Sequence, residues 1–503
     1  MLIFATVNRT IGNNATRILL GSRDREIVMN SLENSETAAR RPRFAARMLA
    51  SVTAAALAVA GFPVQAEAQD RGPPVIRDAE IEQLLRDYTQ PVLKAAGLTQ
   101  QNVRVVIIND RSFNAFVADG RRIFINAGTI MVSDTPNEVI GVLAHEAGHM
   151  AGGHLARLRE QLALASTQAI LAMLVGVGAM VAASRSGNNS IGQAGMAALQ
   201  GPQAMIQNNL LAYVRTQEDS ADRAGVRFLE ATGQSSKGMH DSFKRLADQM
   251  LHNSRFVDPY MQTHPLPAER VRALQGLASA SPHWDKRDSA SLQARHEMIR
   301  AKLYGFMDPP DSVVRRYPLS NNSLPARYAR AIAAYRFGSS ASAGVISQID
   351  TLIQAQPQNP YFHELKGQAL LEAGKSAEAI APLRRAVQLT SNPSLMQIML
   401  AQALLGTNDK AHAEEAVSLL ETALRREPES SEAYTQLAMA YGRKGDLGHA
   451  DLASAQSAFM RGDLKTARQL ATRAKTRFPI GSPGWVKSDD ISTYKPKPNE
   501  MQF

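Results

Sequence analysis

Apolar residues follow first the helical and then the strand period in the stretch that begins near residue 75. Residues 75–98 carry them at helical spacing, which predicts an amphipathic helix that is kinked at Pro91. Residues 103–110 and 121–130 are rich in β-branched residues and predict two strands, with a turn at Asp119-Gly120 between them. This part of the chain therefore combines a helix with a small sheet.

The helical period returns after residue 135. Thr135 has the residue type of an N-cap, Pro136 would occupy the first helical position, and Glu138 would complete a capping box. Apolar residues then recur at helical spacing. The sequence therefore predicts a helix that contains the histidine-rich stretch LAHEAGHMAGGHLARLRE, residues 143–160.

Residues 161–214 are unusual because Arg185 is the only charged residue among them. Residues 162–183 are apolar and numerous enough to cross a bilayer, and a stretch rich in Gly and small polar residues follows. Two interpretations stay open: a transmembrane helix, or two buried or surface-lying helices joined by a mobile Gly-rich link. The second is favoured, since a single crossing would separate two motifs that both carry candidate ligands of one metal ion. Contact of residues 161–205 with a membrane surface is compatible with either.

Proline then marks a boundary between two regions. Helical spacing resumes near Leu210, and residues 263–270, THPLPAER, read as a Pro-punctuated loop that leads into another helix. Residues 281–325 contain several prolines and the segment SNNSLP around one helix. We therefore expect one domain over residues 69–280 and a linker with one helix over residues 281–325.

Residues 326–487 are helical with an internal period of about 34 residues. The clearest unit has small and large residues at the positions of a tetratricopeptide repeat (TPR), namely Leu365, Gly367, Leu370, Gly374, Ala379, Leu383 and Ala386. Further units follow it, and residues 326–357 resemble a degenerate first repeat. Stacked repeats form a solenoid with a concave groove, whereas the alternative is an ordinary helical bundle. Residues 488–503 are rich in Lys and Pro and are expected to form a flexible tail.

The first 68 residues have the features of a signal peptide. A basic stretch, residues 40–47, precedes an Ala-rich apolar run, residues 48–62, and residues 66–68 fit a small-x-small cleavage site. The run is short for a bilayer span, so a retained membrane anchor is the weaker alternative. Because residues 1–28 do not resemble a signal peptide, translation is expected to start at Met29.

The amino-acid composition limits which kinds of binding partner and chemical site are expected. The net charge of +10 is spread over 503 residues, without a dense Lys/Arg block or interleaved aromatic residues, which argues against nucleic-acid binding. A loose affinity for anionic membrane surfaces is compatible with it. The chain has no cysteine, which excludes disulfides, thiolate metal sites and a cysteine nucleophile.

The chemistry is concentrated in HEAGH, residues 145–149. His145 and His149 are four residues apart, so both lie on one helix face and can present imidazole nitrogens to one ion. Glu146 lies beside them, close enough to take a proton from a water molecule at that ion. This is the H-E-x-x-H signature of zinc peptidases. The alternative is a histidine pair on a solvated helix face.

A catalytic zinc site needs a third protein ligand and one open position. The metzincin pattern would place that ligand six residues after His149, where the chain has Leu155. His154 falls one position short and points to a different helix face. We therefore expect His154 to support the site or cap the helix rather than to bind zinc.

A second pattern takes the third ligand from a later helix. Glu218 is followed one turn later by Asp222, so that Glu218 can bind zinc while Asp222 accepts a hydrogen bond from a ligand histidine. Asp219 is the nearest rival. It is rotated by about 100° around the helix and lacks a carboxylate four residues later, so Glu218 is favoured.

HEAGH and EDSADRAG (residues 218–225), preceded by NAF and INAGTI and followed by HPLPAER, resemble the zinc metallopeptidases of the CAAX-prenyl-protease and HtpX kind. With the signal peptide and the repeats, the chain is similar to members that are periplasmic proteases and chaperones of Gram-negative bacteria. Ser220 departs from the family, which often has a second glutamate there, but it is not a ligand position. The resemblance implies one Zn²⁺ held by His145, His149 and Glu218, with Glu146 as the general base.

Two further elements could act at this site. His264, in the Pro-flanked loop, could assist catalysis or occupy the fourth zinc position and keep the enzyme latent; the alternative is a loop-capping histidine. Residues 121–130 could form an exposed strand on which an extended substrate lies, the alternative being an ordinary interior strand.

These patterns and the resemblance predict a mainly α-helical chain, in which an α+β zincin-like metalloprotease domain with a small sheet precedes an α-helical TPR solenoid. The expected function is that of a periplasmic zinc metalloendopeptidase, exported by cleavage near Ala68 and Gln69. Its expected partners are unfolded or misassembled outer-membrane proteins and their assembly machinery, bound through the TPR groove. The alternative is a non-proteolytic TPR chaperone or scaffold with a structural zinc site. Glu146 favours the enzyme, because a structural site needs no base.

Overall fold

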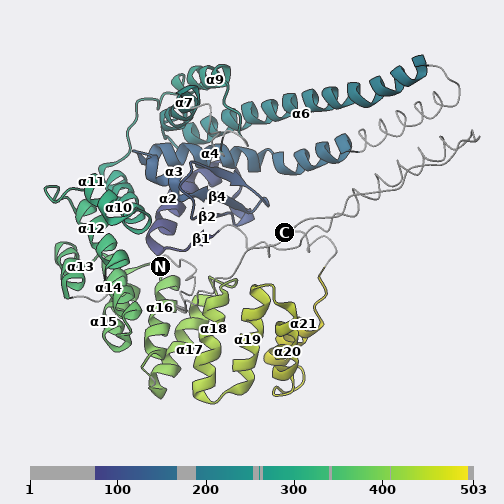
Figure 1. Cartoon of the computed structure of the whole chain (residues 1–503). Helices are drawn as coiled ribbons and strands as arrows, with labels where there is room; N and C mark the ends of the chain where they lie inside the picture. The colour runs from purple at the N-terminus through teal and green to yellow at the C-terminus, as the bar shows by residue number, and fades with distance from the viewer. Residues whose placement is uncertain are drawn as a thin grey trace, which may run out of the picture. The chain divides into compact units, whose positions relative to one another are not determined.

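The computed structural model describes residues 74–166, 189–252, 260, 264–338, 343–407 and 409–496 (Figure 1). Of residues 189–208 and 250–252 only the backbone is described. The predicted signal peptide and most of the apolar run of residues 162–183 lie outside the described residues. The prediction of a mainly α-helical chain with a small sheet is confirmed.

Four short strands form one sheet in the order β1-β2-β4-β3. The central strands β2 (Arg104–Ile108) and β4 (Arg122–Asn126) are parallel, and the edges are β1 (Val75–Ile76) and β3 (Ala115–Val117), each antiparallel to its neighbour. Helices α2 and α4 contact each other and the sheet, as Figure 1 shows.

The second predicted strand is shorter than expected and lies elsewhere in the sheet. Residues 121–130 were expected to form one strand, but Ala127–Val132 form the short helix α3. β4 is also an interior strand, since β2 and β3 occupy both of its edges. The suggestion that residues 121–130 offer an exposed edge is therefore wrong, and β3 has that position instead.

Helix α2 (Ala79–Ala95) begins later than predicted. Val75 and Ile76 pair with β2, and Asp78 then caps the helix by accepting a hydrogen bond from the Ile81 N–H at 2.9 Å. The helical periodicity of the segment hid this change, because a strand of two residues is too short to show a period of its own. Pro91 lies inside the continuous helix.

Helix α4 (Pro136–Ala151) carries HEAGH and is buried over most of its length. Thr135 is its N-cap and Pro136 lies in its first turn, as predicted. The capping box is wrong, because the Thr135 side chain makes no capping hydrogen bond. Glu138 instead accepts from the Asp134 N–H at 3.3 Å and forms an ion pair with Arg245.

Helix α6 (Asn189–Ala231) is one helix of 43 residues. It includes Gly192, Gly195 and Gly201, so the predicted Gly-rich link after Arg185 is helical from Asn189 onward, and no new helix begins near Leu210. Within the described ranges, no helix combines the length and the hydropathy needed to cross a membrane. The proposed membrane contact of residues 161–205 falls mostly on side chains outside the description.

The predicted linker, residues 281–325, contains two helices rather than one. α7 (Lys237–His252) and α9 (Ala268–Ser279) precede it, and α10 (Ala290–Met307) and α11 (Pro310–Arg316) form within it. α10 contributes Ile299 and Leu303, both fully buried, to the same apolar core as α2 and α4. This core continues into the first helices of the repeat region, including Tyr328 and Phe362.

The repeat region is a series of antiparallel helix pairs, as the periodicity predicts. Small buried residues such as Ala379, Ala416 and Ala423 lie where paired helices approach. The predicted tail starts too early, because residues 488–493 belong to the last helix. The helices are α12 (Leu324–Phe337), α13 (Ala343–Ala355), α14 (Pro360–Glu372), α15 (Ser376–Leu389), α16 (Ser394–Leu405), α17 (Lys410–Leu424), α18 (Ser431–Lys444), α19 (Leu447–Met460), α20 (Leu464–Lys475) and α21 (Pro483–Thr493).

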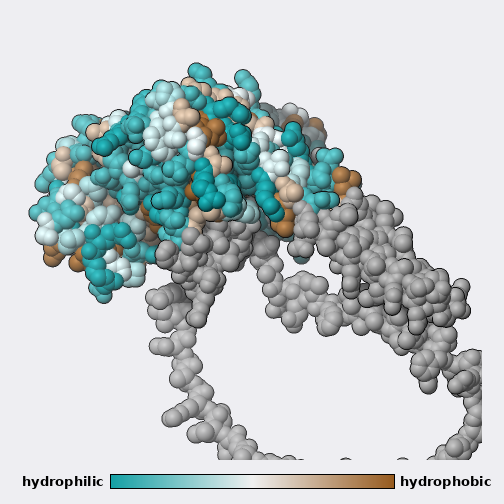
Figure 2. Space-filling model, turned by 90° about the horizontal axis from the view of Figure 1, so that it is seen from above, coloured by the Kyte–Doolittle hydropathy of each residue, from teal (hydrophilic) through white to brown (hydrophobic). Residues whose placement is uncertain are grey.

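The face drawn in Figure 2 is mainly hydrophilic, with hydrophobic residues scattered among the coloured ones. Scattered apolar residues are normal on a protein surface, so that face does not mark a binding site. The candidate functional residues lie in a buried site between α4 and α6.

Candidate metal centre

Glycines allow α4 and α6 to approach closely at the site. A Cβ on Gly148 of α4 would lie 2.7 Å from the Ala221 carbonyl oxygen, and one on Gly225 of α6 would lie 3.2 Å from the His145 nitrogen. Larger side chains would push the two helices apart. The close packing brings the histidines of HEAGH within reach of Glu218 on α6.

The predicted ligands converge. His145 Nε2 lies 3.0 Å from His149 Nε2, and Glu218 contributes Oε2 at 3.5 Å from the first nitrogen and Oε1 at 3.3 Å from the second. His264 joins them, with Nδ1 3.1 Å from Glu218 Oε2 and 3.4 Å from His145 Nε2. One donor atom from each of these four residues lies within 4.8 Å of the other three. Asp219, the rival ligand, instead pairs with the exposed Arg223 at 2.9 Å.

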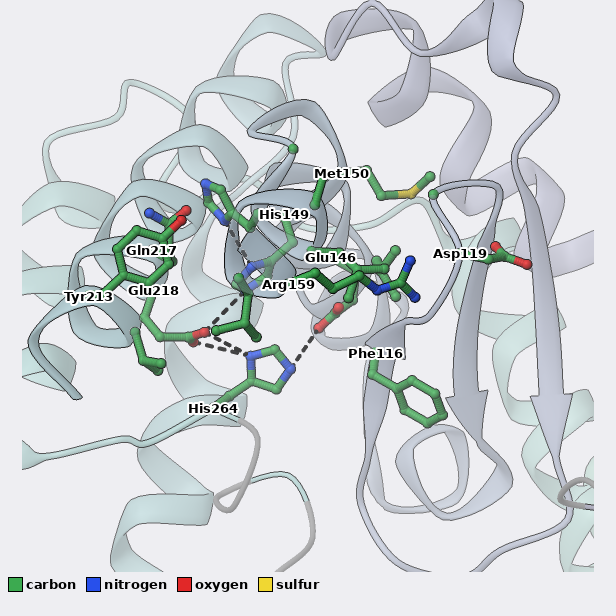
Figure 3. A pocket seen from close by; sticks show the side chains of 18 residues that line it. Phe116, Asp119, Glu146, His149, Met150, Arg159, Tyr213, Gln217, Glu218 and His264 are labelled. Carbon is green, nitrogen blue, oxygen red and sulfur yellow. Dashed lines mark hydrogen bonds and ion pairs between the residues drawn. The ribbon is translucent and has the colours of Figure 1, made fainter. Parts of the chain in front are cut away.

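Glu146 is buried beside this cluster and faces His264 (Figure 3). Its Oε1 lies 3.6 Å from His264 Nε2, and neither carboxylate oxygen has a hydrogen-bond partner among the described residues. Burial raises the pKa of Glu146, although His264 and His145 partly offset this effect. A buried carboxylate without donors is suited to taking a proton from a small molecule that enters the site.

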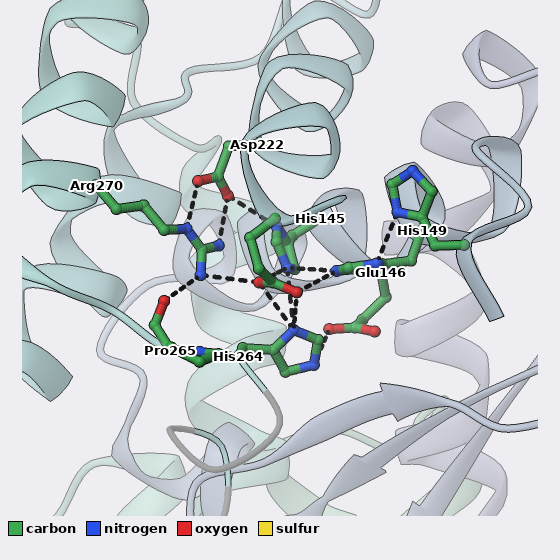
Figure 4. Close-up of polar contacts among 9 residues, drawn as sticks. His145, Glu146, His149, Asp222, His264, Pro265 and Arg270 are labelled. Carbon is green, nitrogen blue, oxygen red and sulfur yellow. Dashed lines mark hydrogen bonds and ion pairs between the residues drawn. The ribbon is translucent and has the colours of Figure 1, made fainter. Parts of the chain in front are cut away.

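Asp222 and Arg270 hold the other side of the cluster (Figure 4). Asp222 Oδ1 lies 2.9 Å from His145 Nδ1 in an ion-pair contact, while Arg270 donates to both Asp222 oxygens at 2.7 and 2.8 Å. The same guanidinium pairs with Glu218 Oε2 at 2.8 Å and donates to the Pro265 carbonyl at 2.9 Å. Burial would raise the pKa of Asp222, but its hydrogen bonds to Arg270 lower it instead.

Asp222 lies beside His145, as the sequence predicts, whereas Arg270 was not predicted. Arg270 ends the HPLPAER motif, six residues after His264, and its partners are distant in sequence on α6. A charged residue directly after a Pro-rich loop was the available signal. Only the folded chain shows that this loop returns to α6.

His154 lies behind His149 rather than at the donor cluster. The two Nδ1 atoms are 2.9 Å apart, and the His154 side chain is buried. This agrees with the expectation that His154 supports the site without completing a metzincin ligand set.

A cleft of about 420 Å³ opens onto Glu146, His149 and His264. Apolar side chains dominate its walls, and polar atoms of Tyr213 and Gln217 face it without hydrogen-bond partners among the described residues. The edge strand β3 borders it through its apolar residues. The wall residues are Phe116, Val117, Met150, Leu155, Leu158, Tyr213, Val214 and Gln217.

Sequence comparisons agree with the geometry. Residues 77–278 match Peptidase family M48. We call this segment the M48 domain. The M48 domain contains HEAGH, Glu218 and His264, and residues 339–456 match the N-terminal TPR repeats region of Psidin.

Two relatives match the chain over most of its length. The chain is 28% identical over 414 residues to the Beta-barrel assembly-enhancing protease of Yersinia pestis, covering 81% of this chain and 82% of the relative. It is 26% identical over 418 residues to the protein of that name from Escherichia coli (strain K12), with the same coverage. It is also 29% identical to Metalloprotease LoiP of the same organism over 186 residues. This alignment covers 37% of this chain and 66% of that protein.

The donor set suits the zinc ion of this family. Two imidazole nitrogens and one carboxylate are the protein ligands of many catalytic zinc sites, and they leave a position for water or substrate. Here His145 and Glu218 are buried and His149 is half-buried, and other residues contact their second nitrogens and oxygens. Glu146 lies beside them without a hydrogen-bond partner among the described residues. The M48 domain is that of a zinc metalloendopeptidase, with one Zn²⁺ as its cofactor.

Proposed function

We propose that the chain is a zinc endopeptidase of the bacterial envelope that acts on outer-membrane or other exported proteins during their assembly. In this proposal His145, His149 and Glu218 hold the zinc and Glu146 is the general base. The observation that carries it is the convergence of these three donors beside a buried carboxylate that has no donor of its own among the described residues.

When bound, zinc supplies Lewis-acid chemistry, which polarises the peptide carbonyl and makes the attacking water more acidic. Glu146 accepts the proton of that water and then passes it to the leaving amine of the cleaved peptide. Asp222, held by Arg270, keeps the proton of His145 on Nδ1 and leaves Nε2 free as a ligand atom. The buried walls around Glu146 limit the access of bulk water.

Substrate would lie along β3. This strand is an edge of the sheet, and Phe116 and Val117 line the cleft next to Glu146. An extended peptide can add to such an edge through main-chain hydrogen bonds, with alternate side chains entering the cleft. The apolar walls favour apolar side chains near the cleaved bond.

His264 would keep the enzyme latent. Its Nδ1 lies within the donor cluster and its Nε2 faces Glu146, so it occupies the space that a substrate carbonyl and the attacking water require. His264→Ala is expected to raise peptidase activity if this contact is inhibitory, or to lower it if the imidazole assists catalysis. In both cases zinc stays bound, and loss of stoichiometric zinc from this variant would contradict either role.

The relatives named above guide the proposal on partners and location. Both full-length relatives are named for enhancing β-barrel assembly, and the repeats of this chain supply a protein-binding array. We therefore propose a periplasmic location after signal-peptide cleavage near Ala68 and Gln69, with unfolded or misassembled outer-membrane proteins and their assembly machinery bound by the repeats.

Casein degradation by the purified mature protein tests the enzyme. Glu146→Gln keeps the size of the side chain but cannot accept the proton, so the rate is expected to fall by about a thousand-fold while zinc content stays at one per chain. Equal rates for the two proteins would leave the scaffold function, with a structural zinc, as the better explanation. If the wild type is latent, Glu146→Gln is tested in the His264→Ala protein and compared with His264→Ala alone.

A second experiment tests the biological role. In cells whose outer-membrane protein assembly is impaired, the wild-type chain is expected to reduce misassembled β-barrel protein, and Glu146→Gln is expected to bind that protein without degrading it. Absence of any effect of the wild type on outer-membrane protein levels would contradict the proposed substrate class.

A further inference from the structure

His145 and His149 have different neighbours behind the metal centre. The Nδ1 of His145 lies 2.9 Å from the carboxylate of Asp222, whereas the Nδ1 of His149 lies 2.9 Å from the Nδ1 of another imidazole, that of His154. We propose that His154 is a positioning residue, which fixes the ring of His149 so that its Nε2 points at the zinc. This inference rests on the proposed ligand role of His149.

The direction of the hydrogen bond follows from the chemistry of the two rings. His149 Nε2 lies 3.0 Å from His145 Nε2 and 3.3 Å from Glu218 Oε1, so this nitrogen is the one directed at the donor cluster. A neutral imidazole that gives its Nε2 lone pair to a metal carries its proton on Nδ1. His149 Nδ1–H therefore donates, and His154 Nδ1 accepts, which places the remaining proton of His154 on its own Nε2.

The turn that follows α4 places His154 next to His149. Gly152 is the C-cap of α4, and Gly153 has φ of +62°, a conformation that glycine adopts without strain. The helix is interrupted there for two residues and resumes at His154, whose ring lies close to Gly152. A Cβ on Gly152 would come within 2.1 Å of His154 Nε2 and 2.5 Å of its Cδ2. The two glycines thus serve one contact, that of His154 with His149.

His154 also borders the cleft but is not one of the four clustered donors. Its effect therefore passes through His149. Losing a hydrogen-bond partner behind a zinc ligand typically weakens metal affinity by about 10–100-fold. This gives a measurement that does not depend on peptidase activity.

The experiment compares the zinc affinity of three variants at His154 with that of the wild type, by competition with a chromophoric chelator. His154→Phe keeps the ring but removes the acceptor, and it is expected to weaken zinc binding by about 10–100-fold. His154→Asn places an oxygen close to the position of Nδ1 and is expected to restore affinity to within about three-fold of the wild type. Gly152→Ala should displace the ring and match His154→Phe, because a side-chain end moves more readily than backbone.

Gly276→Ala is the matched control, since a Cβ there meets no atom within 4 Å. It should bind zinc like the wild type. Absorption of the Co²⁺-substituted proteins gives a second readout, with His154→Phe shifted from the wild-type spectrum and His154→Asn close to it. Melting of the zinc-free proteins checks that all variants fold.

Wild-type affinity and spectrum in His154→Phe would overturn this inference and leave the proposed function intact. Equal weakening in Phe and Asn variants would also overturn it, because it would show that packing rather than the acceptor matters. Failure of the wild type to bind zinc would overturn the proposed function itself.

Discussion

The metal centre and the repeat array are stabilised by different means. The centre packs Arg270, Asp222, Glu218 and His145 together, each with little exposure to solvent, so every member compensates the charge or polarity of another. The array buries small apolar residues such as Ala416 and packs helices against each other. Removing one member of the first network leaves its partners buried and unpaired. A change in the array affects only the neighbouring residues. Equal substitutions should therefore cost more in the centre.

The largest effect is expected from Arg270→Met. Methionine keeps the apolar stem but leaves the carboxylates of Asp222 and Glu218 buried without the guanidinium, which should lower the free energy of unfolding by about 3–5 kcal/mol. Urea denaturation of the zinc-free protein measures this loss. Arg272→Met on the same helix is the control, because Arg272 is 68% exposed and pairs with an exposed glutamate. Similar losses for both variants would contradict the distinction drawn here.

The second effect concerns His296, a buried histidine of α10. His296 of α10 lies between Tyr88 Oη at 3.0 Å and the Ser133 carbonyl at 2.9 Å, and burial lowers its pKa to about 4. The unfolded chain, with a pKa of about 6.5, binds the proton first, so stability is full above pH 6.5 and falls as the pH drops toward 4. The loss is on the order of 3 kcal/mol.

His296→Gln offers both a donor and an acceptor but does not titrate. Denaturation of wild type and variant at pH 7 and pH 4.5 should show a smaller pH dependence in the variant. A pH dependence that is unchanged by the substitution would show that His296 is not the group responsible.

Zinc removal should destabilise the metal centre more than the repeat array. At a free zinc concentration of a hundred times the dissociation constant, binding stabilises the folded M48 domain by about 2.7 kcal/mol. Chelation should therefore speed hydrogen exchange in α4 and in residues 209–231 of α6. Exchange in α17–α19 should change little. Uniform acceleration along the chain would mean that the two regions unfold together.

The smallest effect is expected within the array. A Cβ on Gly367 of α14 would lie 2.3 Å from Cγ of the buried Leu383, so Gly367→Ala should cost about 1–2 kcal/mol despite the better helix propensity of alanine. Gly442→Ala in α18 meets no atom within 4 Å and should stabilise by about 0.5–1 kcal/mol. Thermal melting of both variants tests the pair, and the same sign for both would contradict the packing argument.

In both regions the sequence predicted the features that depend on local spacing. Repeat positions such as Gly367 and Ala379 recur at a fixed period, and HEAGH places two histidines on one helix face, so local spacing was sufficient. The roles of these ligands remain predictions, and Glu218 was predicted from its spacing to Asp222 and from the family resemblance. The contacts of Arg270 and His154 were not predicted, because a returning loop creates the first and the helix interruption at Gly152-Gly153 creates the second.

Short elements were the other source of error. β1 has two residues, and β4 passes directly into α3, so neither boundary leaves a periodic trace. Strand order is a tertiary property, so the sequence alone left both an exposed and an interior position open for residues 121–130, and in the structure β2 and β3 flank β4. The predicted capping box is absent, and Glu138 instead forms an ion pair with Arg245 on α7, a partner distant in sequence.

The burial of α10 bears on how the protein can be divided. A truncated enzyme that ends at Ala280 would lose Ile299 and Leu303 from beneath α2 and α4, together with the imidazole that joins Tyr88 to Ser133. The solvent-exposed oily surface left behind would promote aggregation. A fragment intended to report peptidase behaviour in isolation should therefore extend past Met307.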